Sequence, residues 1–64
     1  MGDKAQYLTE VEVSNLTRMS LSDLRNKRHL GKGIPYIKCS RSVRYDLEDV
    51  IAYMEARKIH TSQD

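Results

Sequence analysis

Residues 8–24 read LTEVEVSNLTRMSLSDL, and this stretch contains two helix starts of the same kind. Thr9 and Ser20 are the expected N-caps, because a hydroxyl side chain accepts a hydrogen bond from a free N–H group of the first helical turn. A carboxylate follows each cap by three residues, at Glu12 and Asp23, which is the pattern of a capping box. Each cap contributes on the order of 1 kcal/mol to stability. The stretch therefore predicts two consecutive helices.

A short turn separates these two helices. The first is predicted over residues 10–16 and the second over about 21–29, where the glycines at positions 31 and 33 end it. Residues 17–19 lie between them, which is the spacing of a helix-turn-helix, whose second helix can enter the major groove of DNA. The expected core residues of the pair are Val13, Leu16, Leu21 and Leu24.

A third helix start lies at residues 45–50. Asp46 is the expected N-cap, and Tyr45 before it can pack against Val50 as a hydrophobic staple. From this point apolar residues recur at the i, i+3, i+4, i+7 spacing of an amphipathic helix. They are Leu47, Val50, Ile51 and Met54.

The segment before the third helix has the period of a β-hairpin. Residues 36–39 and 43–45 alternate as two short strands, and residues 40–42 form the expected tip. The expected inward-facing side chains are Ile37, Cys39, Val43 and Tyr45, and the outward-facing ones are Lys38 and Arg44. The sequence thus predicts a mainly α protein with a small β-hairpin, namely a winged helix-turn-helix of three helices and a two-stranded wing.

Positive charge is concentrated in the middle of the chain. Residues 18–44 contain eight Lys and Arg residues against Asp23 alone, a net charge of +7, whereas residues 1–17 carry −2 and residues 45–64 carry −3. Within a 64-residue chain of net charge +2, such an excess is a plausible footprint for polyanion binding. A solvated basic surface without a partner is the alternative that charge alone leaves open.

Composition argues against several other classes. The chain has one cysteine, Cys39, so it cannot hold an intramolecular disulfide, and neither His29 nor His60 lies at a metal-ligand spacing from it. No nucleophile is paired with a base, and no apolar run approaches the ~20 residues of a membrane span. We therefore expect no enzymatic activity, no metal or other cofactor, no membrane partner, and a cytoplasmic, nucleoid-associated location.

Several segments together resemble a known family. Residues 7–13 (YLTEVEV), 35–38 (PYIK) and 43–50 (VRYDLEDV) are similar, in order and spacing, to the small excisionase-like and AlpA-like winged helix-turn-helix proteins of the MerR type. The family pattern is an LT-x-x-E-V-A helix, a V-S-x-x-T-L-Y recognition helix, P-Y-I-K and R-V-R-Y strands and an E-D-L-x-A-W-L helix. The resemblance implies a DNA-binding protein, either a phage or mobile-element excisionase (recombination directionality factor) or a small transcriptional regulator.

The resemblance covers residues 6–57, the expected DNA-binding domain, with flexible ends expected at residues 1–5 and 58–64. Arg18 stands where the family usually has a turn glycine, which costs roughly 1 kcal/mol if the backbone there is left-handed. Further departures are Ser40 and Arg41 in place of a Gly-Gly wing tip, Cys39 at a usual leucine position and Met54 at a usual leucine or tryptophan position.

The proposed docking places residues 20–29 in the major groove and the wing, residues 36–45, on the minor groove or the backbone. Ser22, Arg25 and Asn26 are the candidates for base edges, because arginine pairs with guanine and asparagine with adenine through two hydrogen bonds. The candidates for phosphate or minor-groove contacts are Arg18, Lys27, Arg28, Lys38, Arg41 and Arg44.

A module of this size offers roughly 600–1,000 Å² of DNA contact, which is little for one copy. We therefore expect further copies on adjacent DNA sites, with an integrase as a possible additional partner. The alternative function is a protein-binding adaptor, whose basic face would dock an acidic partner such as an integrase or a polymerase subunit.

Overall fold

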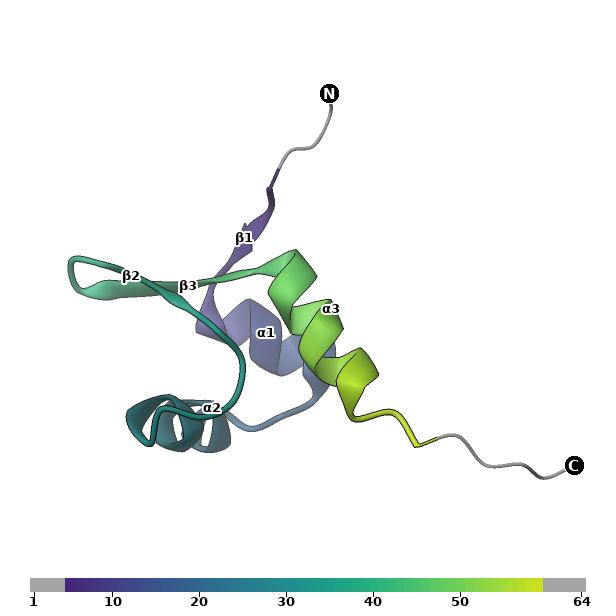
Figure 1. Cartoon of the computed structure of the whole chain (residues 1–64). Helices are drawn as coiled ribbons and strands as arrows, with labels where there is room; N and C mark the ends of the chain where they lie inside the picture. Colours follow the sequence, from purple (N-terminus) through teal and green to yellow (C-terminus); the bar gives the residue numbers. More distant parts are fainter. Residues whose placement is uncertain (1–4, 60–64) are drawn as a thin grey trace, which may run out of the picture.

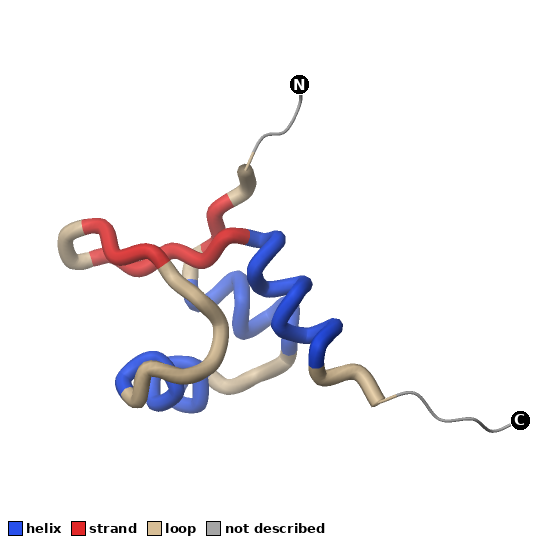
Figure 2. The backbone as a smooth tube through the Cα atoms, viewed as in Figure 1, coloured by secondary structure: helices blue, strands red, loops and turns tan. Residues whose placement is uncertain are grey.

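The computed structural model describes residues 5–59, of which about half are helical. The elements in chain order are β1 (Tyr7–Leu8), α1 (Glu10–Thr17), α2 (Leu21–His29), β2 (Ile37–Cys39), β3 (Ser42–Asp46) and α3 (Leu47–Ala56) (Figure 1). The helices surround one end of a small antiparallel sheet, and β3 runs into α3 without a loop (Figure 2). Flexible ends are expected at residues 1–5 and 58–64, and most of these residues, 1–4 and 60–64, lie outside the described residues.

All three expected N-caps are present. The Thr9 hydroxyl accepts a hydrogen bond from the Glu12 backbone N–H at 3.1 Å, and the Glu12 carboxylate accepts one from the Thr9 N–H at 2.8 Å, which completes a capping box. Ser20 caps α2 through its hydroxyl, which lies 3.0 Å from the backbone nitrogen of Asp23, but the expected capping box is not completed, because the Asp23 carboxylate pairs with Lys27 instead of the Ser20 N–H. Asp46 caps α3 through the N–H of Glu48 at 3.1 Å. The helix starts are therefore confirmed.

The sheet has three strands, in the order β1-β3-β2, rather than the two that the sequence predicted. The additional strand, β1, pairs antiparallel with β3 and places Leu8 opposite Tyr45. A backbone hydrogen bond of 2.9 Å from the Leu47 N–H to the Gln6 carbonyl continues this pairing. Two residues are too few to show the alternation by which a strand is recognised, so β1 was missed.

The register of the hairpin differs from the expected one. Two residues, Ser40 and Arg41, form the turn, and Ser42 belongs to β3 instead of the tip. Lys38 therefore lies opposite Val43, and Ile37 lies opposite Arg44. A shift of one residue turns every side chain of a strand to the other face of the sheet.

The prediction that Ile37 and Cys39 face the core is therefore wrong. Both side chains are exposed, on the sheet face that also carries Arg44, whereas Lys38 shares the face of Val43 and Tyr45. The expected inward direction of Tyr45 is confirmed, since this residue is buried. Val43 is half-buried and packs against the core.

The core is small and lies where α1, α2 and α3 meet the sheet. Its buried residues are Leu8, Val13, Leu24, Ile34, Tyr45 and Val50. Leu21 and Leu47 are half-buried against it. The expected burial of Leu16, Ile51 and Met54 is wrong, because these side chains line an open depression between α1 and α3 that no described element covers.

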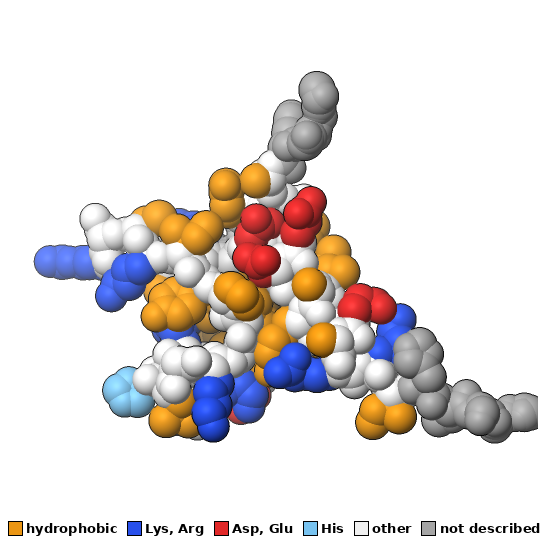
Figure 3. Space-filling view, in the orientation of Figure 1, with side chains coloured by type: hydrophobic (Ala, Val, Ile, Leu, Met, Phe, Trp, Pro, Cys, Tyr) orange, Lys and Arg blue, Asp and Glu red, His pale blue; other side chains and the backbone are white. Residues whose placement is uncertain are grey.

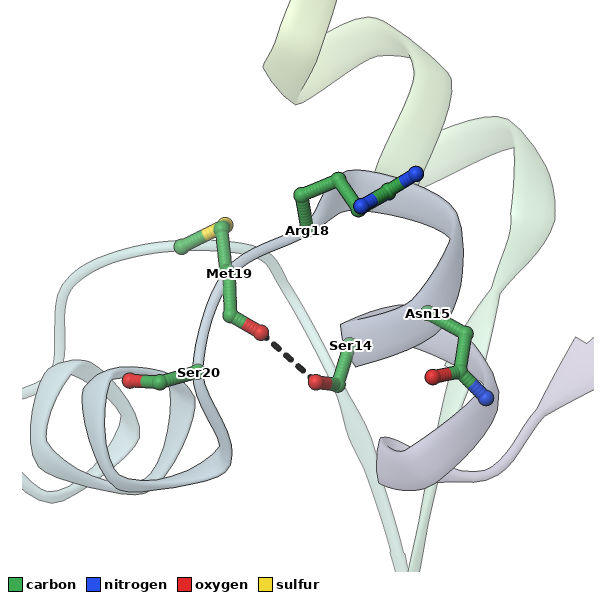
Figure 4. Close-up of a pocket in the computed structure, with 5 residues that line it drawn as sticks. All are labelled: Ser14, Asn15, Arg18, Met19 and Ser20. Atoms are coloured by element: carbon green, nitrogen blue, oxygen red, sulfur yellow. Dashed lines mark hydrogen bonds between the residues drawn. The ribbon is translucent and has the colours of Figure 1, made fainter.

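The turn between α1 and α2 contains a left-handed residue. Arg18 caps the C-terminus of α1 with φ = 65°, and its N–H donates to the Ser14 carbonyl at 2.8 Å. The Ser14 hydroxyl donates in turn to the Met19 carbonyl at 2.6 Å (Figure 4). These bonds fix the angle at which α2 leaves α1. Within residues 5–59, no helix has the length and apolar character that a membrane crossing requires.

Candidate nucleic-acid interface

Two elements of the basic segment protrude on the same side of the molecule. α2 and the end of the β2–β3 hairpin both lie on the left in Figure 1, away from α3. Lys and Arg side chains lie on the hairpin end and around α2, Asp and Glu side chains gather where β1 meets the start of α3, and charges of both signs lie toward the end of α3 (Figure 3). Much of the positive charge of residues 18–44 thus lies on one side of the molecule, where it also contacts Glu10 of α1.

The exposed face of α2 contains the three residues expected at base edges. Ser22, Arg25 and Asn26 are all exposed, and they are spaced i, i+3 and i+4 on one side of the helix. The buried Leu24 holds α2 against the core. His29 continues this exposed face one turn further on, at i+7. The sequence analysis did not assign His29 to the site, although this spacing was available to find it.

Arg25 is held by Glu10, the first residue of α1. Its Nε lies 3.2 Å from both carboxylate oxygens, and its Nη2 lies 2.6 Å from Oε2. The Arg25 side chain is 56% exposed, and that of Glu10 is 24% exposed. The hydrogen bond from Arg25 is the main cause that lowers the pKa of the Glu10 carboxyl; desolvation opposes it, and smaller Coulombic contributions from Arg25 and Arg28 add to the lowering. The same hydrogen bond raises the pKa of Arg25.

Arg28 connects α2 to the sheet. Its Nη1 donates to the Tyr45 hydroxyl at 2.8 Å and lies 3.5 Å from Oε1 of Glu10. Its guanidinium also lies over the Tyr36 ring, 5.7 Å from the centroid, within cation–π range. Because only 20% of its side chain is exposed, the main contacts of Arg28 are internal.

The other basic side chains differ in how they are held. Lys27 forms an ion pair of 3.2 Å with Asp23, one turn earlier on α2. Arg44 donates to the Val43 carbonyl at 2.9 Å. Lys38 and Arg41 are exposed on the hairpin, and neither forms an ion pair with another of the residues 5–59.

A depression of about 340 Å³ lies between the start of α1 and the hairpin. Three of the expected phosphate-contacting residues, Arg28, Arg41 and Arg44, line it together with Glu10. The structure thus brings residues from α2, the hairpin turn and β3 to one place. It places Arg18 elsewhere, at the turn between the first two helices.

Arg18 lines an open depression of about 510 Å³ with Asn15 and Ser20 (Figure 4). A neighbouring depression joins Arg18 to Ser22 and Asn26, so the turn and the exposed face of α2 form one continuous surface. The sequence analysis missed Asn15 and Ser20 as members of this surface. Ser20 was recognised solely as a helix cap, and Asn15 has no pattern around it that points to binding.

Other chemistry has little support among the described residues. Within residues 5–59, no group of three His, Cys, Asp or Glu side chains comes close enough to hold a metal ion. Asp46, Glu48 and Asp49 lie at the start of α3, where carboxylates stabilise the helix N-terminus. No protein-family model, curated protein or solved structure matches the chain.

Proposed function

We propose that this chain is a winged helix-turn-helix protein that binds double-stranded DNA in a sequence-specific manner, as an excisionase or a small transcriptional regulator. In this proposal α2 enters the major groove, and the β2–β3 hairpin acts as the wing on the adjacent minor groove or backbone. Genomic neighbourhood separates the two roles, because an excisionase is expected to be encoded beside an integrase.

The observation that carries the proposal is the position of α2 and the hairpin end on one side of the molecule, both with basic side chains (Figures 1 and 3). An α-helix such as α2 has a diameter of about 10–12 Å with its side chains. The major groove is about 12 Å wide and admits one helix. The carboxylates of the α3 start gather away from α2 and the hairpin end, which reduces repulsion between the protein and phosphates.

The contacts in this proposal follow from exposure. Ser22, Arg25 and Asn26 face the bases from the outer side of α2. Arg18, Lys38, Arg41 and Arg44 supply charge to phosphates or the minor groove, and Lys27 does so by exchanging Asp23 for a phosphate. Arg28 contributes mainly by fixing α2 relative to the hairpin, since its guanidinium is already bound to Tyr45 and Glu10.

A salt titration of DNA binding tests the proposal. Each phosphate that the protein neutralises contributes about −0.9 to the slope of log K against log salt concentration. Arg41→Ala is expected to reduce the magnitude of the slope by about 0.9 if the hairpin turn contacts a phosphate. Lys58→Ala is the matched control, because it removes the same charge at the far end of α3, where Lys58 pairs with Glu55 at 2.9 Å.

Equal slopes for Arg41→Ala, Lys58→Ala and the unmodified protein would refute the contact between the wing and DNA. Absence of binding to any duplex at about 50 mM salt, where electrostatic binding is strong, would refute the DNA-binding function itself. That second result would favour the adaptor function, in which the basic face binds an acidic protein. If the protein does bind, sedimentation of the protein–duplex complex counts the copies expected on adjacent sites.

A further inference from the structure

Glu10 and Arg25 come from different helices, fifteen positions apart in the chain, and they meet in a two-point contact. The carboxylate binds the side edge of the guanidinium, with Oε2 2.6 Å from Nη2 and Oε1 3.2 Å from Nε. Glu10 is itself held in place, because it is the first residue of α1 and also lies 3.5 Å from Nη1 of Arg28. Arg28 is fixed in turn by the Tyr45 hydroxyl. The carboxylate is therefore a fixed anchor for Arg25.

The contact leaves the outer end of Arg25 available. An arginine has five N–H groups, one on Nε and two on each Nη. Glu10 accepts from Nε and from one N–H of Nη2, and Arg25 forms no other side-chain hydrogen bond within residues 5–59. Both N–H groups of Nη1 and the second one of Nη2 remain. Guanine is read in the major groove by such a fork, through its O6 and N7 acceptors.

The anchor favours a base over a phosphate as the target of Arg25. A phosphate that approached the guanidinium would be repelled by the Glu10 carboxylate bound to the same group. The neutral edge of guanine carries no net charge and is much less affected. The contact has also already restricted the rotamers of Arg25, so less conformational entropy is lost when the fork binds a base.

We propose that Glu10 is a positioning residue that determines sequence specificity, because it holds Arg25 on α2 with the guanidinium fork directed at a guanine in the major groove. This inference rests on the proposed DNA-binding function and deepens it. The site recognised by the protein then contains a G·C pair opposite Arg25, and the preference for that pair depends on a residue of α1 that does not itself touch DNA.

The test starts from duplexes selected from a random-sequence pool by the unmodified protein. Competition binding then compares a selected duplex with versions in which single G·C pairs are changed to A·T. One position is expected to show a preference for guanine of about 5- to 150-fold, the range of one bidentate contact. Glu10→Gln is expected to reduce this preference at least about fivefold.

Glu12→Gln is the matched control. It removes the same charge from the same helical turn, and glutamine at this position still completes the capping box. The guanine preference of this variant is expected to equal that of the unmodified protein. A purely electrostatic effect would change the DNA affinity of both variants equally. Loss of the contact that positions Arg25 would lower the guanine preference of Glu10→Gln alone.

Two further variants keep the inference testable if Glu10→Gln fails to fold. Glu10→Asp retains the charge at the helix N-terminus, but its shorter side chain cannot keep the two-point contact, so the preference should fall here as well. Arg25→Lys removes the fork, and adding Glu10→Asp to it should change nothing further.

The outcomes separate the inference from the function on which it rests. Binding to no duplex would overturn the proposed function. Binding without a guanine preference, or a preference that survives in both Glu10 variants, would overturn the inference and leave DNA binding intact.

Discussion

Arg18 is the residue whose replacement is expected to stabilise the protein. It occupies the left-handed region with φ = 65° at the C-cap of α1, where a side chain bearing Cβ is disfavoured. Its side chain is exposed and forms no hydrogen bond or ion pair within residues 5–59. Arg18→Gly therefore removes backbone strain without removing a contact seen in the described part of the chain.

The expected gain is the difference between two terms. A left-handed L-residue costs roughly 1–2 kcal/mol. Glycine in place of arginine also lowers the stability by about 0.4–1 kcal/mol, because it increases the conformational entropy of the unfolded chain. With the middle of each range, the net stabilisation is about 0.8 kcal/mol. For a domain of this size, that corresponds to an increase in Tm of roughly 3–6 °C.

Thermal and urea unfolding, followed by circular dichroism, measure this gain. Arg18→Ala is the control, since alanine removes the same charge and side chain but keeps the Cβ atom at φ = 65°. We expect Arg18→Ala to differ little from the unmodified protein. Equal stabilities of Arg18→Gly and Arg18→Ala would refute the argument from backbone strain. In DNA binding, by contrast, the two variants should behave alike, because both lose the expected phosphate contact.

Three further predictions concern pH, hydrogen bonding and packing. Because the hydrogen bond from Arg25 lowers the pKa of Glu10 below 4.5, its stabilising effect is present above that pH and is lost as the pH falls through the folded-state pKa. Urea unfolding of Glu10→Gln should thus differ from that of the unmodified protein at neutral pH and coincide with it in strong acid. Tyr45→Phe removes the acceptor of a charged hydrogen bond and should cost about 1.5 kcal/mol in denaturant unfolding. Val13→Ala, at a fully buried site, should cost about 2 kcal/mol, whereas Val11→Ala on the exposed side of α1 should cost under about 0.5 kcal/mol.

Each of these predictions has a result that contradicts it. A difference between Glu10→Gln and the unmodified protein that persists unchanged in strong acid would show that the ion pair is not its source. Unchanged stability of Tyr45→Phe would mean that water replaces the lost acceptor without penalty. Similar losses for the two valine variants would contradict the position of the core.

The helix starts could be predicted because their causes are local. Thr9, Ser20 and Asp46 form their caps with backbone groups two or three residues away, so the sequence contains all the partners. The exposed spacing of Ser22, Arg25 and Asn26 follows equally from the helical period. What the sequence could not provide is the pairing of distant segments.

The hairpin illustrates that limit. Ser40 and Arg41 contain no glycine that would mark a two-residue turn, although Ser40 adopts φ = 55° in the structure. The length of the turn therefore could not be predicted from the sequence. The resulting error of one residue in the register assigned the side chains of β2 to the wrong faces of the sheet. The contact between Glu10 and Arg25 was missed for a related reason, because it depends on how two helices are placed relative to each other.

The hairpin register also has a consequence for the chemical accessibility of the chain. Cys39 is the one cysteine in the sequence, and it lies exposed beside the turn on the outward face of the sheet. A thiol reagent can therefore modify it in the folded protein, without prior unfolding. In the opposite register the same sulfur would belong to the interior, and its modification would require the domain to open. A fluorophore attached at Cys39 would consequently report on the surroundings of the hairpin while the core remains intact.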